Sequence, residues 1–464
     1  MKRRQGGLIL LSWNQTIAPA AAGEGRCWIV TRRKYVVVLM LLMLAVLLTS
    51  PWASAPEPDL APDAAPEGQE TIEEEPVFAE QHADLTVKII QEEDTYRLLA
   101  RQSAAFERGH PDIRVQLERV DPDDAADLLD NWHKAEEGAD VALIPSIWVK
   151  RLAVSGMLLP ADAAFEGDAL SEQFEAVAAP LKWNGYMWGV PHHMDPYVVV
   201  WNRARLSAAA RQDGSVLSLP LGAQDWATLG AEMASEGSRP WLAIDERDSA
   251  ALLTWLGAST GIRPDLLLGD SNGPWGSGPA AAMLDTLRGT VGLRVPDRDA
   301  SFWQAMASGQ YAAAVTRLSV AEKGIASLGA DAAAGLSIDR SGWDKAYAFE
   351  GGASFVIGAG TQGESAAKTW IAAMTETQLQ LDNYDEAGYL PVYRSAYADR
   401  HALPALTGRG AQQYPNWAPQ AGPEWPLLMN KIGIYWTDWR QGRLALADWP
   451  ARWSGLLADL QLHD

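Results

Sequence analysis

Cysteine and basic residues are scarce in this 464-residue chain, which has one cysteine, and 38 lysines and arginines against 59 acidic residues. A single cysteine excludes a disulfide framework and any cysteine-rich zinc or iron–sulfur site. The formal net charge of −21 leaves no surplus of cations to neutralise phosphates, which argues against nucleic acid as a partner. The chain is 48% hydrophobic, enough for a large core, and its length predicts roughly two or three domains.

The N-terminal region has the pattern of a secretion signal. A basic patch precedes the apolar run Val36–Leu48, and Ala53-Ser54-Ala55 supplies a small-residue cleavage site. These features predict that residues 1–55 are a signal peptide. An uncleaved membrane anchor stays open as the alternative, because Tyr35–Ala53 is near the lower length limit for a span. Residues 1–29 are unusual in a signal, and we interpret them as an over-extended start.

Residues 56–84 have a different composition, with ten acidic residues, five prolines and no lysine or arginine. Such a segment cannot bury enough apolar surface to offset its chain entropy. We predict a disordered acidic linker between the membrane surface and the folded part.

From Leu85 onward, strand and helix patterns alternate. Apolar residues alternate in 85–90 and again in 113–117, which predicts two strands. Helical spacing over 95–108 predicts a helix between them, and a buried third strand follows at 139–145. Strands and helices joined by short links predict an α/β fold with a largely parallel sheet.

Ligands in such folds bind beyond the carboxyl ends of the strands, so Gln91–Thr95 and Pro145–Trp148 are candidate site segments. Further along, Asn184-Gly185 predicts a hairpin turn and 197–202 predicts a buried strand. The end of the chain, 425–462, is predicted to be helical and is rich in aromatic residues.

Five blocks of the folded region follow one another in an order typical of a known family. They are LTVKII…FERGHPDIRV, GADVALIPSIWVKRLAVSGMLLP, LKWNGYMWGVPHHMDPYVVVWNRARL, FEGGASFVIGAGTQGESAAKTWIAAMTE and GYLPVYRSAY. In this order they resemble the extracellular solute-binding proteins of ABC importers, in the branch that includes maltose-binding protein and other sugar binders. The resemblance covers about residues 85–460.

This resemblance implies a two-lobe α/β fold of the periplasmic-binding-protein type (type II), with a ligand cleft between lobes joined by crossing segments. By position, the first lobe is 84–193 plus 346–382 and the second is 197–343 plus 384–464. The implied crossings lie near His192–Tyr197, Gly342–Phe349 and Gln380–Asp385.

The function that the resemblance implies is capture of a sugar or oligosaccharide by lobe closure and delivery to the permease subunits of an ABC transporter. The protein would be an extracytoplasmic monomer without enzymatic activity, cofactor or metal. Two alternatives from other classes stay open, namely a membrane-anchored surface sensor or scaffold with the same fold, and a carbohydrate-active enzyme. A glycosidase needs two carboxylates at a defined separation, which spacing along a sequence cannot establish.

Aromatic rings and carboxylates are the groups that bind the apolar faces and hydroxyl rims of sugars. Trp148 is the leading aromatic candidate, because it follows the carboxyl end of a strand. Tyr414 and Trp417 lie in a Pro-rich stretch where relatives often supply a stacking ring, and Trp188 and Trp425 are weaker candidates. For any one tryptophan, core packing is the competing explanation.

Asp195 matches by position an acidic residue that accepts sugar hydroxyls in relatives. A hinge residue that caps a turn before Pro196 is the alternative.

The remaining candidates also come from the resemblance. Glu93 and Asp94 lie in the loop after the first strand, which contacts ligand in relatives, although a solvated acidic loop explains them equally well. Gly352 and Ser354 lie on a Gly-rich stretch that approaches ligand in relatives, and backbone freedom is the alternative. His193 is a ligand-binding candidate at the first crossing. The adjacent histidines point to opposite faces of an extended segment, so they predict no metal site.

Two features depart from the family pattern. Thr316-Arg317-Leu318 stands where the family has Gly-x-Trp, and Ala353 or Ser354 stands where a stacking tryptophan is common. These differences leave the identity of the ligand open.

Overall fold

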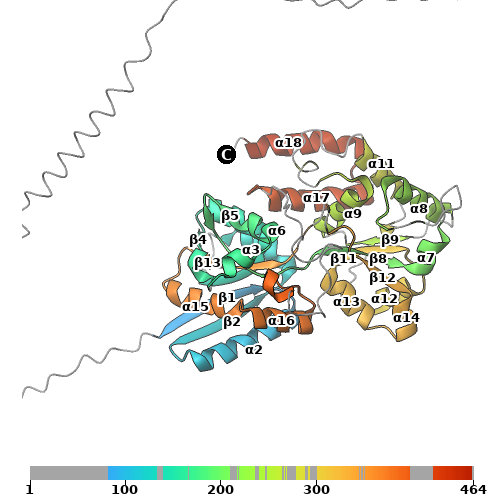
Figure 1. The fold of residues 1–464 in the computed structure, drawn as a ribbon. Helices are drawn as coiled ribbons and strands as arrows, with labels where there is room; N and C mark the ends of the chain where they lie inside the picture. The colour runs from blue at the N-terminus through green and yellow to red at the C-terminus, as the bar shows by residue number, and fades with distance from the viewer. Residues whose placement is uncertain are drawn as a thin grey trace, which may run out of the picture. The chain divides into compact units, whose positions relative to one another are not determined.

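Figure 1 shows the computed structural model as a ribbon. The structure describes residues 82–461 except for 133–138, 166, 210–216, 218, 236–239, 246–247, 264–265, 267, 269–277, 288–290, 293–299, 344, 346–348, 350 and 398–421. The predicted signal or anchor and most of the predicted linker lie outside the described residues. Ala83 and Asp84, assigned to the linker, instead begin the first strand. Within the described part of the chain, no helix combines the length and apolar character that crossing a membrane requires.

One sheet contains the N-terminal strands, and we call this sheet with its covering helices the first lobe (Figure 1). Its strand order is β2-β1-β3-β13-β4, and β7 also pairs with β13. The strands are β1 (Ala83–Ile90), β2 (Ile113–Val120), β3 (Val141–Pro145), β4 (Leu158–Leu159), β7 (Val190–His193) and β13 (Ala353–Gly358). β1 is parallel to β2 and β3, as the alternating strand and helix pattern predicts. β13 is antiparallel to β3, β4 and β7, so the α/β sheet is mixed and the prediction of a largely parallel sheet is wrong.

Helices α2 (Glu93–Gly109) and α15 (Glu364–Met374) pack on this sheet because each has one apolar face. Leu99 and Phe106 of α2 are buried, as the spacing predicts, and the Trp370 indole of α15 donates a hydrogen bond to Ser103 Oγ at 3.1 Å. Residues on successive positions of β13 alternate between two core clusters, with Phe355 in one and Val356 in the other.

A second sheet, with the helices around it, forms the second lobe (Figure 1). Its strand order is β10-β9-β11-β8-β12. The strands are β8 (Tyr197–Asn202), β9 (Leu242–Ile244), β10 (Val291–Gly292), β11 (Ala313–Arg317) and β12 (Leu336–Asp339). β8 is antiparallel to both of its neighbours, and all six of its residues are buried, which confirms the predicted buried strand.

The helices of the second lobe cover both faces of its sheet. They are α7 (Arg203–Ala208), α8 (Ala223–Ser235), α9 (Ser249–Thr260), α11 (Pro279–Thr286), α12 (Ala300–Ala307), α13 (Leu318–Ala326), α14 (Ala330–Ala334), α17 (Trp425–Arg440) and α18 (Trp449–Gln461). Tyr197, Val199 and Trp201 point into the core beneath α9 and α17, while Val198 and Val200 point into the core on the opposite face.

Short elements complete the described chain. They are α3 (Ala125–Asp130), α4 (Val149–Val154), α5 (Ala169–Glu172), α6 (Glu175–Ala178), β5 (Lys182–Trp183), β6 (Tyr186–Met187), α16 (Thr377–Ala387) and the 3-10 turns η2 (Pro122–Asp124), η4 (Ser146–Trp148), η5 (Asp162–Ala164), η6 (Ala179–Leu181), η7 (Arg394–Tyr397) and η9 (Leu446–Asp448). Asn184 and Gly185 both have positive φ, at 48° and 85°, as the predicted hairpin turn requires.

The chain passes from the first sheet to the second through Met194–Pro196, between the end of β7 and the start of β8. Gly351 and Gly352 lie against this segment with φ of 58° and 86°. A Cβ on Gly351 would come within 2.2 Å of the Asp195 carbonyl oxygen, and one on Gly352 within 2.2 Å of the His193 carbonyl oxygen. The two glycines therefore allow two backbone segments to pass in direct contact.

The predicted third crossing, near Gln380–Asp385, falls inside helix α16, which continues unbroken to Ala387. That helix packs on α2 of the first lobe, where Gln102 donates to Asn383 at 2.8 Å. After Gly388 the chain reaches the first crossing, and Leu390 and Met194 exchange two backbone hydrogen bonds of 2.9 Å.

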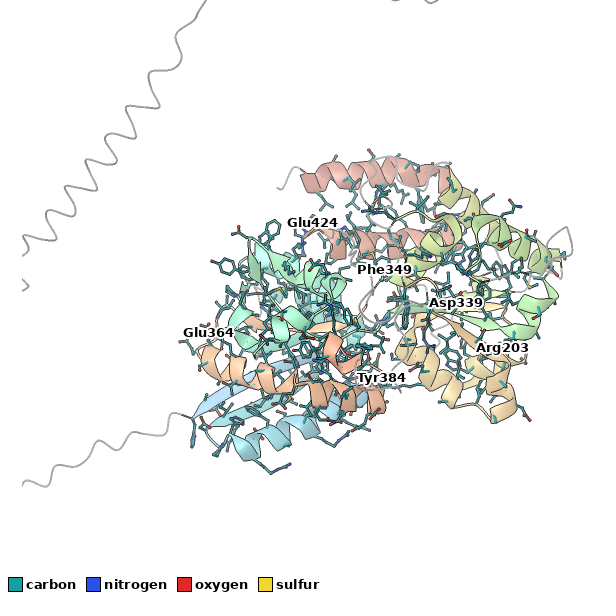
Figure 2. All side chains as sticks on the ribbon, in the orientation of Figure 1. Arg203, Asp339, Phe349, Glu364, Tyr384 and Glu424 are labelled. Atoms are coloured by element: carbon teal, nitrogen blue, oxygen red, sulfur yellow. The ribbon has the colours of Figure 1, made fainter. Side chains whose placement is uncertain are left out.

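The two lobes also touch beside η4. Arg151 of α4 forms an ion pair of 3.2 Å with Glu424, which directly precedes α17 (Figure 2). Ile147 packs against the core clusters of both lobes.

We expect Gly352→Ala to lower the free energy of unfolding by at least about 2 kcal/mol more than Gly185→Ala. The two glycines have φ of 86° and 85°, but a Cβ at Gly185 meets nothing within 4 Å. Gly185→Ala is therefore the control, and it measures the cost of a positive φ alone, about 1–2 kcal/mol. The additional loss in Gly352→Ala measures the backbone clash at the crossing. Urea unfolding of both variants gives the comparison, and equal losses would contradict the close approach.

Candidate functional site

The facing edges of the two sheets meet at the first crossing. In the second sheet, Arg317 at the end of β11 is paired in register with Tyr197 at the start of β8. In the first lobe, β1 ends at Ile90 and β3 ends at Pro145, so the segments that follow them begin at the same edge of that sheet. Polar side chains from both lobes gather around this crossing.

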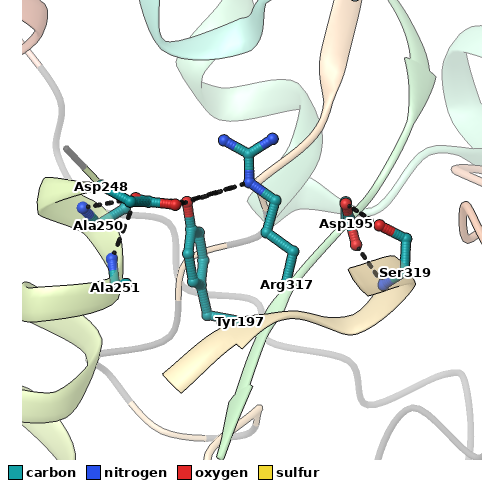
Figure 3. Close-up of polar contacts among 7 residues, drawn as sticks. All are labelled: Asp195, Tyr197, Asp248, Ala250, Ala251, Arg317 and Ser319. Atoms are coloured by element: carbon teal, nitrogen blue, oxygen red, sulfur yellow. Dashed lines mark hydrogen bonds and ion pairs between the residues drawn. The ribbon is translucent and has the colours of Figure 1, made fainter. Parts of the chain in front are cut away.

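On the second lobe, three side chains form a hydrogen-bonded chain that we call the Arg317 cluster (Figure 3). Arg317 Nε donates to the Tyr197 hydroxyl oxygen at 3.3 Å, and the Tyr197 hydroxyl donates to Asp248 at 2.8 Å. Asp248 caps helix α9 by accepting from the backbone N–H groups of Ala250 and Ala251 at 3.1 and 3.2 Å. Burial raises the pKa of Tyr197, so its hydroxyl remains a neutral donor.

Asp195 lies within the crossing and is 3% exposed. Its two carboxylate oxygens accept from the Ser319 backbone N–H at 2.9 Å and from the Ser319 hydroxyl at 2.6 Å (Figure 3). Burial raises the pKa of Asp195, while Arg317 and the bonds from Ser319 oppose that rise. The carboxylate thus fastens the crossing to the first turn of α13, and its predicted acceptance of a sugar hydroxyl stays a prediction.

On the first-lobe side, four buried side chains form a directional hydrogen-bond relay. Gln102 Nε2 donates to Asn383 Oδ1 at 2.8 Å, and Asn383 Nδ2 lies 3.1 Å from His192 Nε2. An amide NH₂ can only donate, so His192 Nε2 accepts and its Nδ1 carries the proton. That proton is donated to His193 Nδ1 at 2.8 Å, which leaves the proton of His193 on Nε2.

His193 Nε2 ends the relay as a donor, and no hydrogen-bond partner for it exists among the residues that the structure describes. The imidazole is 4% exposed and stacks on Tyr389, with ring centroids 3.9 Å apart and 17° between the planes. The Tyr389 hydroxyl is in turn 2.9 Å from Thr95 Oγ1 in the first turn of α2. His193 is thus the predicted site residue that the structure places with a free donor at the crossing.

The other predicted residues occupy more varied places. Trp148 is 7% exposed and packs in the first-lobe core, so its ring offers little surface to a ligand in this structure. Ser354 is fully buried, with its hydroxyl 2.8 Å from Ser146 Oγ. Gly352 lies against the crossing rather than against open space. The ligand-binding roles of these residues stay predictions.

Glu93 and Asp94 lie in the first turn of α2. Glu93 forms ion pairs with Arg97 at 2.8 Å and with Arg119 at 3.2 Å, while Asp94 is exposed.

Tyr414 and Trp417 lie outside the described residues. The two weaker candidates lie in different lobes. The Trp188 indole donates to the Trp183 carbonyl oxygen of the β5–β6 hairpin, and Trp425 is buried in the second-lobe core.

Several residues of the assembled site were not among the predicted candidates: Tyr197, Asp248, Arg317, Tyr389, Ser319, Gln102 and Asn383. One signal pointed to Arg317, since it stands where the family pattern has Gly-x-Trp. In the described segments, no group of three or more His, Cys, Asp and Glu side chains has the geometry to hold a metal ion.

The histidine relay generates a prediction about pH. Burial lowers the pKa of His192 to about 4, and burial, His192 and the charge of Arg317 together lower the pKa of His193. An unfolded histidine binds its proton near pH 6.5. The part of the free energy of unfolding that depends on keeping these histidines neutral is therefore fully present above about pH 6.5. It decreases as the pH falls toward 4.

We expect the free energy of unfolding of the wild type to fall by about 3 kcal/mol more than that of His192→Gln between pH 6.5 and 4. Urea titrations at several pH values measure both profiles. Because the carboxylates titrate equally in both proteins, parallel profiles would show that His192 is not held neutral.

Comparison with known proteins places this geometry in a family. Residues 102–408 match the family of bacterial extracellular solute-binding proteins, whereas no curated protein matches the chain. The fold is similar to that of the GacH receptor of Streptomyces glaucescens, with 18% identity, a TM-score of 0.62, and coverage of 82% of this chain and 98% of that one. It is also similar to maltose-bound MalE3 of T. maritima, with 17% identity, a TM-score of 0.63, and coverage of 82% and 100%.

A third similar structure is the sugar-binding protein MalE from Xanthomonas citri, with 18% identity, a TM-score of 0.62, and coverage of 82% and 98%. These likenesses confirm the predicted two-lobe α/β fold. The family match spans more than half of the chain and confirms the resemblance found in the sequence blocks. The protein belongs to the bacterial extracellular solute-binding proteins.

Proposed function

We propose that this protein captures a sugar or oligosaccharide between its two lobes and delivers it to the permease subunits of an ABC transporter. The observation that carries the proposal is the match of residues 102–408 to an extracellular solute-binding family whose fold this chain shares. The similar structures include a receptor studied with acarbose, a maltose-bound protein and a protein with bound D-mannitol. Family and fold neighbours are binding proteins, which supports a role without catalysis.

The arrangement at the crossing supports binding between the lobes. Arg317 and Tyr197 come from the second lobe, whereas Thr95 and Tyr389 contact each other on the side of the first. A ligand that bonds to both sides gains its full set of contacts only when the lobes close, so it shifts the population toward the closed state. Closure would then be the signal that the permease recognises, with the protein acting as a monomer outside the cytoplasm.

A sugar panel tests this function directly. At one hundred times its dissociation constant, a true ligand is expected to raise the free energy of unfolding by about 2.7 kcal/mol, which a thermal-shift assay detects. The same mixtures should show no new reducing ends after incubation, because the proposal assigns no hydrolytic step. Absence of any saccharide-dependent shift would refute the capture role, and new reducing ends would favour a carbohydrate-active enzyme.

We expect Asp195→Asn to weaken saccharide binding by about 1–3 kcal/mol, measured by calorimetry. The amide cannot accept from both donors of Ser319, so the first turn of α13 loses its attachment to the crossing. Asp331→Asn, the same change in the exposed first turn of α14, serves as the control and should leave affinity unchanged. Equal affinities for the wild type and Asp195→Asn would remove Asp195 from the binding site.

A further inference from the structure

Arg317 presents an unused part of its side chain at the edge of the second sheet. The side chain is 51% exposed. Its Nε faces the Tyr197 hydroxyl at 3.3 Å and Asp248 Oδ2 at 3.9 Å. No hydrogen bond or ion pair reaches Nη1 or Nη2 from any part of the chain that the structure describes. In Figure 3 both nitrogens point away from Tyr197, Asp248 and Asp195.

Two contacts with Tyr197 restrain this guanidinium on its Nε side. Tyr197 accepts from Nε, and the aromatic ring of Tyr197 lies 5.9 Å from the guanidinium carbon. Tyr197 is itself fixed by its bond to Asp248, which caps α9. The terminal nitrogens are therefore offered as a preorganised pair of charged donors, and a guanidinium stays charged at all physiological pH values.

The carboxylates nearest to this pair are already occupied. Asp195 accepts two bonds from Ser319. Asp248 accepts from Tyr197 and from two amide groups at the positive end of α9, which compensates part of its charge. Across the crossing, Glu93 is paired with Arg97 and Arg119. Asp195, Asp248 and Glu93 are thus engaged, whereas Nη1 and Nη2 of Arg317 have no partner among the described residues.

A second, independent donor lies at the same crossing. The relay from Gln102 leaves the proton of His193 on Nε2, and this nitrogen has no partner in the described structure although the residue is 4% exposed. His193 and Arg317 each lie two residues before one end of the Asp195–Ser319 hydrogen bonds, which brings both residues to the same crossing. His193 is consequently a neutral donor beside a positive one.

This pattern decides between two kinds of ligand. A neutral sugar has hydroxyl groups that need acceptors as well as donors, whereas an oxyanion only accepts. Two terminal guanidinium nitrogens match the paired oxygens of a carboxylate, sulfate or phosphate group.

We propose that the saccharide captured by this protein carries an oxyanionic group, bound by Nη1 and Nη2 of Arg317 with support from Nε2–H of His193. The proposal rests on the proposed function and specifies its substrate class as acidic saccharides. It gives Arg317 the role of discriminating them from their neutral counterparts.

Calorimetry on the full-length protein tests the ligand class. Three acidic probes (an oligogalacturonide, a sulfated disaccharide and a hexose phosphate) are each compared with the neutral saccharide of the same backbone. At least one acidic probe is expected to have a dissociation constant at least ten times lower than that of its neutral counterpart. The probe that does so identifies the oxyanion as a carboxylate, sulfate or phosphate.

Substitutions at Arg317 test the residue. Arg317→Gln should weaken binding of the preferred acidic probe by tenfold to a hundredfold, a larger factor than for the neutral saccharide of the same backbone. Arg317→Lys keeps the charge but not the paired nitrogens, so its affinity for the acidic probe should lie between those of the wild type and Arg317→Gln. Arg443→Gln is the matched control, because Arg443 is 56% exposed on the second lobe and pairs with Asp438 away from the crossing. Unfolding midpoints of all variants verify that each is folded.

The failures are distinguishable. If neutral saccharides bind as tightly as acidic ones and Arg317→Gln changes neither, the oxyanion proposal is wrong while sugar capture stands. If no saccharide of either kind binds the folded wild type, the proposed function itself is wrong, and the oxyanion proposal fails with it.

Discussion

The architecture depends on a constraint at the first crossing, where Met194–Pro196 are all that separate two sheets. β7 completes the edge of the first sheet, and β8 is an inner strand of the second. So short a connection forces the backbone of Gly351 and Gly352 into contact with it and leaves no room for side chains there. It also buries Asp195, whose charge then requires the two donors of Ser319.

The same constraint explains how charge is distributed at the site. Carboxylates near the crossing are used for structure, because Asp195 secures α13 and Asp248 caps α9. Among the described residues, no acceptor is found for His193 Nε2 or for Nη1 and Nη2 of Arg317, since the relay through Asn383 ends at His193 and the bond to Tyr197 occupies only Nε of Arg317. The described side chains at the crossing of this acidic protein therefore include one exposed charged donor, Arg317, and one buried neutral donor, His193.

Local periodicity was enough to predict the elements that form this frame. The apolar residues of β1 and α2 repeat at strand and helix spacing, and the continuous apolar run of β8 indicates a strand that is buried on both faces. Side-chain direction at the ends of strands was harder to predict. The position of Trp148 after β3 is visible in the sequence, but the inward turn of its ring depends on packing with distant residues. Arg317 differs from the family pattern, but its contacts are not evident in the sequence because its partners Tyr197 and Asp248 lie far away along the chain.

Most of the abundant tryptophans that the structure describes pack in the hydrophobic cores rather than at the candidate site. Of the 16 tryptophans that the structure describes, 14 are buried, and nine of these belong to the single core cluster beneath α9 and α17: Trp201, Trp226, Trp241, Trp255, Trp425, Trp436, Trp439, Trp449 and Trp453. Their rings lie close to one another, as with the 5.3 Å between Trp436 and Trp439. Ultraviolet absorption by the described part of the molecule will therefore come mainly from the second lobe, so a change in that lobe's core will dominate an absorption difference spectrum.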